Sequence, residues 1–231
     1  MTDQPFRDEG YVKFQQVRVE GPSLPMPLWE NLERTRSKLY EAGLVGMYDD
    51  GIGFGNVSWL APDAEGTAER HFLPDEHFSN PPGFRPFVIS GTQTGRYPHL
   101  TGQHYVLVTQ VNPQVNQLQC KGPVDASSES MTHAAVYAAD LRIGCVLHVH
   151  HAGHWSRLLY KVPTTAADVP YGTPAMAEEV GRLFLEENLG EVGCFAMAGH
   201  EEGLVSFGSD TQQALNRLVE WGVLPQELRA I

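Results

Sequence analysis

Four histidines lie close together in residues 145–155, which read C-V-L-H-V-H-H-A-G-H-W. The run over residues 143–149 is apolar and β-branched, which is typical of a buried strand. Successive side chains on a strand point to opposite faces, so His148 and His150 should leave the same face about 7 Å apart. Two imidazoles placed in this way can both reach one metal ion, at roughly 2.0–2.1 Å each. The spacing therefore predicts a metal site on this strand.

A catalytic zinc ion usually has three protein ligands and keeps one position open. The best candidate for the third ligand is His200, which lies in a glycine-flanked turn between two predicted strands. His151 and His154 are the competitors. His151 should point to the strand face opposite to His150, and His154 requires the chain to turn back. The alternative for the pair His148 and His150 is two ordinary histidines of a core or of a sheet edge.

Glu129 is the candidate acid/base residue. It lies in the first turn of a helix predicted over residues 126–139, where the helix dipole favours a carboxylate. Beside a divalent ion the same carboxylate can act as a metal ligand or as a general base. His133, one turn further on, shares its helix face and is a candidate for a supporting role. The alternatives are a plain helix-terminal charge and an ordinary helix-face histidine.

Three short segments offer hydroxyl, amide and backbone N–H donors to an anionic substrate. One of them also lies at a predicted helix N-terminus, a natural site for phosphate or carboxylate. Taken singly, each segment is also typical of a turn or a cap. The candidate anion-binding residues are Asn56, Ser58, Ser90, Gly91, Thr92, Ser127 and Ser128. The sequence contains no Walker or dinucleotide-binding fingerprint.

The order of the predicted elements indicates one layered α/β domain with helices on both faces of a sheet. A proline-rich break at residues 21–27 separates an N-terminal arm, residues 1–27, from the main domain, residues 28–231. Strands are predicted at residues 87–89, 105–111, 143–149, 192–198 and 204–207. Helices are predicted at residues 28–42, 126–139, 173–188 and 209–221, with N-caps at Ser127 or Ser128, at Thr173 and at Ser209.

Composition excludes several classes of partner. The 231-residue chain has a formal net charge of −12 at pH 7, which argues against nucleic acid and anionic membrane surfaces. No apolar run approaches the length of a membrane span, and the first residues contain no apolar signal region. Cys120, Cys145 and Cys194 are far apart on apolar stretches and should be buried free thiols. We therefore expect a cytoplasmic protein that binds a small molecule.

Six motifs follow one another along roughly residues 28–222. They read G-N-V-S, S-G-T-Q-T-G, S-S-E-S-M-T-H-A-A-V-Y, L-H-V-H, Y-G-T-P-A-M-A and G-H-E-E-G-L-V-S-F-G. In this order they resemble the class II aldolase/adducin family. The resemblance implies a three-layer α/β/α sandwich with a largely antiparallel central sheet. It also implies a homotetramer with active sites between neighbouring subunits.

The resemblance also implies roles for individual residues. His148, His150 and His200 correspond to the histidines that bind a divalent metal, usually zinc, with manganese or another divalent ion as the alternative. Glu129 corresponds to the acid/base residue. The anion-binding candidates named above correspond to the segments that bind the phosphate or carboxylate of the substrate.

The implied activity is that of a metal-dependent carbon–carbon lyase, which performs a retro-aldol cleavage through a metal-stabilised enolate. The substrate would be a small anionic hydroxy-acid, oxo-acid or sugar derivative. The alternatives are a decarboxylase of the same family, an epimerase or dehydratase, and a non-catalytic adducin-like module. The short loop between His150 and Tyr171 lacks the substrate-contacting tyrosine of the sugar-phosphate aldolases. The sequence G-H-E-E-G around His200 also departs from the H-H-G or N-H-G of many members, and epimerases tend to have aspartate in place of Glu129.

Overall fold

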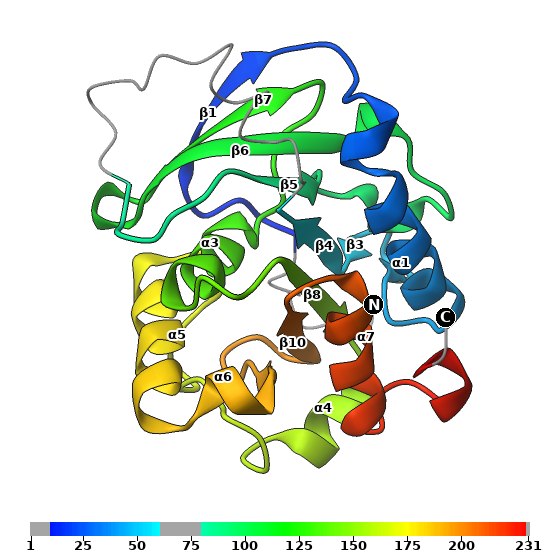
Figure 1. The fold of residues 1–231 in the computed structure, drawn as a ribbon, viewed down its shortest axis with the longest axis vertical. Helices are drawn as coiled ribbons and strands as arrows, with labels where there is room; N and C mark the ends of the chain where they lie inside the picture. The colour runs from blue at the N-terminus through cyan, green and yellow to red at the C-terminus, as the bar shows by residue number, and fades with distance from the viewer. Residues whose placement is uncertain (1–9, 61–79, 230–231) are drawn as a thin grey trace, which may run out of the picture.

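The computed structural model describes residues 10–60 and 80–229. Residues 1–9 of the predicted arm lie outside the described residues. The chain forms a mixed eight-stranded sheet with the strand order β1-β7-β6-β5-β4-β8-β10-β9 (Figure 1). The strands are β1 (Gln15–Glu20), β4 (Asn56–Trp59), β5 (Phe87–Ser90), β6 (Tyr105–Asn112), β7 (Gln117–Gly122), β8 (Cys145–His150), β9 (Cys194–Ala196) and β10 (Gly203–Gly208). Two further short strands, β2 (Gly46–Met47) and β3 (Gly53–Phe54), pair with each other.

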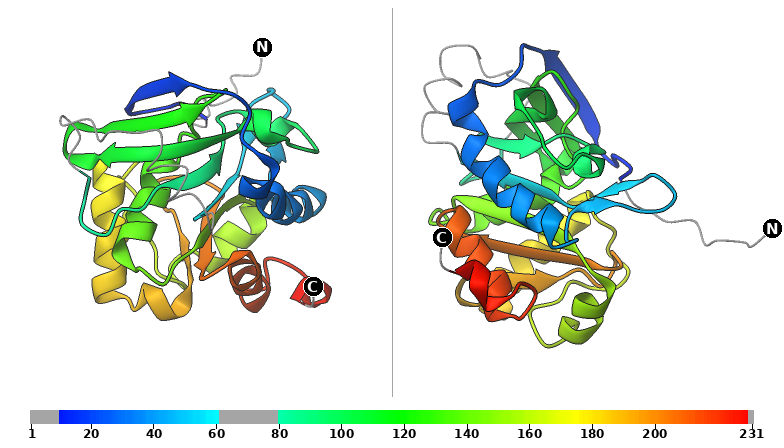
Figure 2. Two further views of the ribbon diagram at one scale, coloured as in Figure 1. Left: turned by 45° about the horizontal axis from the view of Figure 1, so that its top comes forward. Right: turned by 90° about the vertical axis from the view of Figure 1, so that its right-hand side faces the viewer.

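The pairing of the sheet is mostly antiparallel, as predicted. Only β1 runs parallel to its neighbour, β7, and the other adjacent pairs are antiparallel. Strand β1 comes from the predicted arm and forms one edge of the sheet (Figure 2). The site described below depends on β4, β8 and β10, which are adjacent near the other edge.

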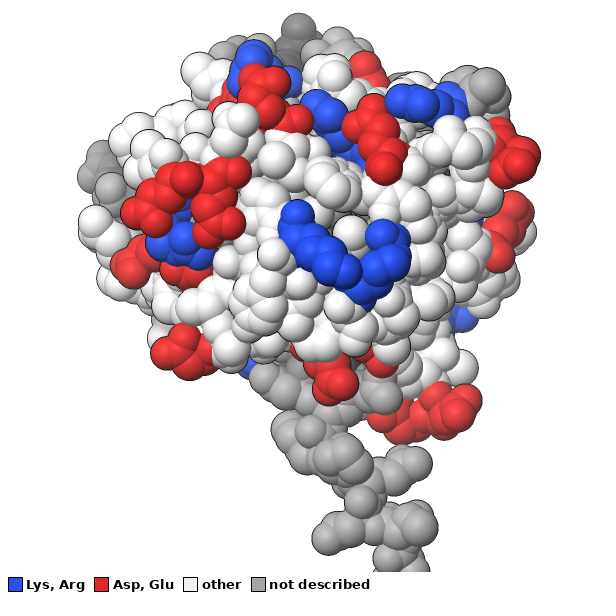
Figure 3. Space-filling view, turned by 90° about the horizontal axis from the view of Figure 1, so that it is seen from below, with Lys and Arg blue, Asp and Glu red and all other residues white. Residues whose placement is uncertain are grey.

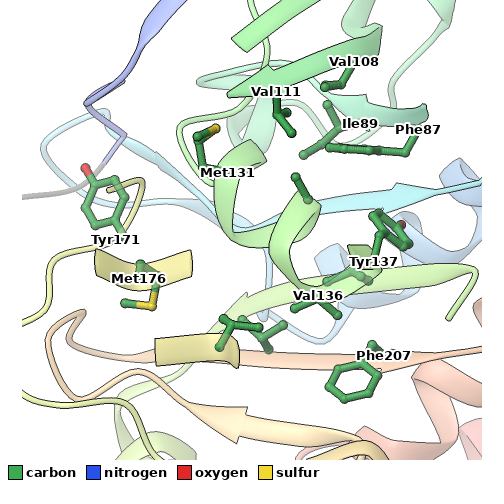
Figure 4. Packing of buried hydrophobic residues seen from close by; sticks show 14 of the residues in the cluster. Phe87, Ile89, Val108, Val111, Met131, Val136, Tyr137, Tyr171, Met176 and Phe207 are labelled. Atoms are coloured by element: carbon green, nitrogen blue, oxygen red, sulfur yellow. The ribbon is translucent and has the colours of Figure 1, made fainter. Parts of the chain in front are cut away.

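Helices lie on both sides of these strands (Figure 1). They are α1 (Glu30–Glu41), α3 (Ser130–Ala139), α4 (Ala152–Leu158), α5 (Pro174–Glu186), α6 (Leu189–Val192) and α7 (Thr211–Glu220). Alternation along β8 divides the core into two clusters. Leu147 and Val149 pack with α1 and α7, whereas Val146 belongs to the cluster on the side of α3 and α5. Figure 4 shows this second cluster, with Met131 and Val136 from α3 and Met176 from α5. Since side chains alternate, His148 and His150 face the side of α3 and α5.

The helix N-termini were predicted with mixed success. Thr173 is the N-cap of α5, and its hydroxyl accepts a hydrogen bond from the N–H of Met176. The predicted caps at Ser127 or Ser128 and at Ser209 were wrong. The N-cap of α3 is Glu129, and the N-cap of α7 is Asp210, whose carboxylate accepts from the N–H of Gln213. In both cases a carboxylate residue one or two positions further on takes the place of the predicted serine.

A buried arginine fixes the loop that follows the predicted anion segment at the end of β5. Arg36 on α1 is 1 % exposed, and its guanidinium donates to the backbone carbonyls of Thr94, Gly95, Tyr97 and Pro98. Glu33 lies 3.9 Å from this guanidinium and accepts from the hydroxyl of Tyr105 at 2.7 Å. Several charge-assisted hydrogen bonds of this kind compensate the desolvation of the buried charge. The conformation of the loop is therefore tied to α1 and β6.

The three cysteines, Cys120, Cys145 and Cys194, are buried and free, as predicted. On the face shown in Figure 3, acidic side chains are spread around a few basic ones. Among the described residues, none of the helices combines the length and the apolar character needed to cross a membrane.

Candidate functional site

The three histidines that were predicted as metal ligands lie together at one end of β8 and β10. One ring nitrogen from each of His148, His150 and His200 lies within 4.8 Å of the other two, and all three side chains are buried. Nε2 of His148 and Nε2 of His150 are 2.8 Å apart, which confirms that the two side chains leave the same face of the strand. His151 and His154 are outside this group. His151 is the exposed N-cap of α4 and accepts from the N–H of His154.

Pairing between β8 and β10 brings His200 to the other two histidines. Gly203 is the register partner of His150, so the turn that precedes β10 places His200 next to the end of β8. A Cβ atom at Gly203 would lie 2.8 Å from Cδ2 of His200 and 3.2 Å from Cε1 of His148. Glycine at this position therefore allows the two imidazoles to approach each other.

Glu129 lies at the same place. Its side chain is 1 % exposed, and Oε1 is 3.5 Å from Nε2 of His200. Among the described residues, neither carboxylate oxygen has a hydrogen-bond partner. A buried ionised carboxylate without partners is unfavourable, and burial raises the pKa of Glu129 to about 7. The group is thus balanced between its acid and its base form near neutral pH, as general acid/base catalysis requires.

The histidines are held in the form that binds metal. Burial lowers the pKa of His148 to about 3. Burial, the adjacent His148 and the charge of Lys13 lower the pKa of His200 well below its usual value. Both rings are therefore neutral at pH 7, and a neutral imidazole has the lone pair that a metal needs.

The donor set fits a divalent metal. Two nitrogens that bind one tetrahedral ion at roughly 2.05 Å are separated by about 3.3 Å. The observed range, from 2.8 Å between His148 and His150 up to 4.8 Å within the group, brackets this separation. The carboxyl of Glu129 next to the group supplies an oxygen that could contact the ion or exchange a proton with a bound substrate. Three buried imidazoles beside a buried carboxyl are a donor set that could hold a divalent cation.

Asn56 and Ser58 lie on the same face of β4 but differ in their surroundings. Asn56 is the register partner of His148, and its buried Oδ1 has no hydrogen-bond partner among the described residues. The hydroxyl of Ser58 instead lies 2.6 Å from Nδ1 of His133 and 2.7 Å from the hydroxyl of Tyr137. Asn56 is thus adjacent to the histidines, whereas Ser58 belongs to a buried network under α3.

The other two anion segments lie side by side. Gly91 forms an isolated bridge with Ala126, and the N–H of Thr92 donates to the carbonyl of Asp125. The N–H of Gly91 donates to the carbonyl of His104. Because both N–H groups are used within the fold, the hydroxyl of Thr92 is what this segment can offer a ligand.

The serines of the anion segments are largely occupied as well. The hydroxyl of Ser90 accepts from the N–H of Val57 at 3.2 Å. The hydroxyl of Ser127 accepts from the N–H of Glu129 at 3.3 Å. Ser128 is 4 % exposed and directly precedes Glu129. Ser127 therefore holds the backbone at Glu129, and Ser90 supports the backbone of β4.

Two residues that were not among the predicted site residues lie next to His150: Tyr48 contacts its ring, and Glu202 contacts Tyr48. The hydroxyl of Tyr48 lies 2.9 Å from Nδ1 of His150 and donates to Oε2 of Glu202 at 2.8 Å. Glu202 has a positive φ of 69°, which is unusual for a residue other than glycine. The sequence G-H-E-E-G, which departs from the H-H-G or N-H-G of many family members, could have drawn attention to Glu202. No sequence pattern connects Tyr48 with Glu202 or with His150.

Two further residues near His200, Tyr171 and Lys13, were not among the predicted site residues. The ring of Tyr171 packs against His200 with 4.3 Å between the ring centroids. Nζ of Lys13 lies 3.7 Å from the centroid of the Tyr171 ring, a cation–π contact. The hydroxyl of Tyr171 also accepts from the N–H of Tyr11. The segment that leads into β1 thus brings a positive charge to the site.

A separate cavity of about 290 Å³ is lined by residues that include Arg142, Phe207 and Arg217. It lies at the opposite end of β8 and β10 from the histidines, because Gly208 in its lining is the register partner of Cys145. None of the predicted site residues lines it. The chemistry indicated by the histidines and Glu129 is therefore independent of this cavity.

Solved structures with a similar fold are class II aldolases and related proteins. An L-fuculose 1-phosphate aldolase is 16 % identical, covers 87 % of this chain and 84 % of its own, and has a TM-score of 0.58. A sugar-phosphate aldolase from Thermotoga maritima is 15 % identical, covers 85 % of this chain and 91 % of its own, and has a TM-score of 0.56. YgbL from Klebsiella pneumoniae, a putative aldolase/epimerase/decarboxylase, is 20 % identical, covers 84 % of each chain and has a TM-score of 0.51. At these identities the likeness concerns the fold.

The family itself is shown by the sequence. No curated protein matches the chain. The family model for the Class II Aldolase and Adducin N-terminal domain matches residues 85–222, which is more than half of the 231 residues. This range includes Glu129 and the three histidines. The chain therefore belongs to the class II aldolase/adducin family.

Proposed function

We propose that this protein is a metal-dependent carbon–carbon lyase that cleaves a small anionic hydroxy-acid, oxo-acid or sugar derivative. The observation that carries the proposal is the group of three buried imidazoles, His148, His150 and His200, next to the buried carboxyl of Glu129. A divalent cation bound there would supply Lewis-acid stabilisation of the negative charge that develops on the substrate's oxygens. Zinc is the proposed ion, because three imidazoles suit it and leave a position open.

Residues of the chain are proposed to transfer the proton, to exclude water and to orient the substrate. In the retro-aldol cleavage a hydroxyl of the substrate loses its proton and becomes the aldehyde, and the electron pair of the broken carbon–carbon bond stays on the carbon next to the carbonyl. The carboxyl of Glu129 donates the proton that this carbon takes up, and the proton released by the hydroxyl replaces it, so that no net proton is consumed. The pKa of about 7 allows Glu129 to be protonated again before the next turnover. Burial of the group excludes water from the reacting atoms. The amide of Asn56 is expected to orient a polar group of the substrate, and its position next to His148 supports this role.

The proposal includes two features implied by family membership, the three-layer α/β/α arrangement and a homotetramer with active sites between subunits. It also includes the cytoplasmic location expected from the composition. The two core clusters on opposite faces of the sheet support the first. The buried free thiols support the last.

A product assay tests the proposal. Purified protein loaded with zinc or manganese would be incubated with a panel of small hydroxy-acids, oxo-acids and sugar phosphates. Release of an aldehyde supports a retro-aldol reaction, and release of carbon dioxide identifies the decarboxylase alternative. A rearranged or dehydrated product indicates the epimerase or dehydratase. If the protein binds no metal and releases no product, the result supports the alternative of a non-catalytic adducin-like module.

Lys13 should determine the preference for an anionic substrate. Its ammonium group is stacked on Tyr171, which in turn packs on His200, and its charge reaches Glu129 and His200. We expect Lys13→Met to raise KM for the anionic substrate roughly 10- to 100-fold, the usual value of a charge-assisted hydrogen bond, with a smaller change in kcat. Steady-state kinetics measure this split. The control is Lys161→Met, since Lys161 is exposed. An unchanged KM in the Lys13 variant would refute a role in substrate binding.

A further inference from the structure

We propose that Glu202 and Tyr48 form a positioning relay that fixes the tautomer of His150 and directs its Nε2 lone pair to the metal. This inference rests on the proposed metal site and adds two residues to it. The relay is made of two short contacts, from the Glu202 carboxylate to the Tyr48 hydroxyl at 2.8 Å and from that hydroxyl to Nδ1 of His150 at 2.9 Å.

The direction of the two hydrogen bonds follows from the fact that the hydroxyl of Tyr48 has a single proton. The hydroxyl of Tyr48 donates its single proton to the carboxyl of Glu202. The oxygen of Tyr48 can then only accept from His150, which requires an N–H on Nδ1 of that ring. Nε2 of His150 consequently has a lone pair.

The contact between the two strand histidines agrees with this assignment. Nε2 of His150 and Nε2 of His148 are 2.8 Å apart, a distance that requires one lone pair and one N–H. The relay assigns the lone pair to His150. His148 is then the donor of this hydrogen bond in the metal-free protein.

The backbone of Glu202 gives a second, independent observation. A φ of 69° costs a residue with a side chain roughly 1 kcal/mol or more, and glycine would avoid this cost. The strained position is occupied by glutamate, although the next residue in the same turn, Gly203, is a glycine. Strained residues of this kind cluster at functional sites. The carboxylate that reaches Tyr48 is a physical reason for keeping glutamate at this position.

The relay connects segments that are far apart in the sequence. Tyr48 is between β2 and β3, and Glu202 is in the turn between His200 and β10. Phe54 on β3 packs against Tyr48 at 4.4 Å and against His150 at 5.7 Å between ring centroids. The hairpin of β2 and β3 therefore holds the phenol against the imidazole, and rotation of either ring is restricted.

Two measurements test the relay. In the metal-free protein, nitrogen-15 NMR of the histidine rings should show His150 protonated on Nδ1, and Tyr48→Phe should mix its tautomers. Calorimetric titration with zinc should show affinity roughly 10- to 100-fold lower for Tyr48→Phe and for Glu202→Gly, as is usual when the partner of a metal-binding histidine is lost.

The controls separate failure of the relay from failure of the proposed function. Glu201→Gln changes the exposed neighbouring glutamate and should leave zinc affinity unchanged. Wild-type protein that binds zinc with the same affinity as Tyr48→Phe would overturn the relay and leave the metal site intact. Wild-type protein that binds no zinc would overturn the proposed function, and the NMR tautomer of His150 would still decide about the relay. An N–H on Nε2 of His150 would contradict it directly.

Discussion

Replacing His148 by alanine should abolish tight binding of a divalent metal. The side chain is one of three imidazoles whose nitrogens lie within 4.8 Å of one another. Loss of a ligand is more severe than loss of a ligand's partner, so the affinity should fall by more than about 100-fold. Metal analysis of protein purified without chelator and calorimetric titration with zinc both measure this. His200→Ala should have the same effect although it lies on a different segment.

The loss of metal should also be visible in stability. A ligand that binds only the folded state stabilises it by about 2.7 kcal/mol when its free concentration is 100 times Kd. Zinc should therefore raise the unfolding temperature of the wild type and leave that of His148→Ala unchanged. His154→Ala is the matched control, because His154 is in the same histidine-rich segment and outside the cluster. His148→Asn fills more of the buried space if the alanine variant does not fold. Equal metal content in the wild type and both His148 variants would refute the site.

Replacing Glu129 by glutamine should abolish turnover and leave the metal bound. Glutamine keeps the shape of the side chain but cannot donate or accept the proton. Positioned general acid/base groups contribute roughly 10²- to 10⁴-fold, so kcat should fall by that factor. The assay is product release by the zinc-loaded protein, with metal content measured on the same sample. Activity within tenfold of the wild type would exclude Glu129 as the acid/base residue.

The same variant should change the dependence of stability on pH. Burial raises the folded-state pKa of Glu129 from 4.5 to about 7. A raised pKa means that the folded state binds the proton more tightly, so the contribution to stability is present below pH 4.5 and is lost as the pH rises through 7. Glu129→Gln removes this loss. In metal-free protein the variant should therefore gain stability relative to the wild type between pH 5 and pH 8, by at most about 3 kcal/mol. Chemical unfolding at the two pH values measures the difference.

Features with a local physical cause could be predicted from the sequence. Residues that alternate on a strand share a face, and His148 and His150 do so. The proline after Thr173 marked the start of α5, and Thr173 is its cap. The N-cap of α7 was placed one residue too early, because serine and aspartate are comparable caps, and the hydrogen bond from Gln213 to Asp210 forms only in the folded chain. The N-cap of α3 was placed one or two residues too early, and Glu129 occupies that position without a side-chain capping hydrogen bond.

The position of Ser58 shows the limit of reading a motif from its residue types. Its hydroxyl was expected to face an anion, and it lies in a buried network with His133 and Tyr137. Both partners come from α3, and no local pattern indicates that this helix covers β4 at Ser58. Gly91 and Thr92 give a similar case, because their N–H groups donate to His104 and Asp125.

The sequence by itself determined where the candidate site begins, because His148 and His150 alternate on one strand and therefore share a face. It also identified His200 and Glu129 as the residues to be brought to that pair. Only the tertiary structure decided their surroundings. The pairing of β8 with β10 brings His200 to the pair, and Tyr48 reaches Glu202 across 154 positions of the chain. Contacts at such separations depend on the packing of the whole sheet, and no local pattern of residues encodes them.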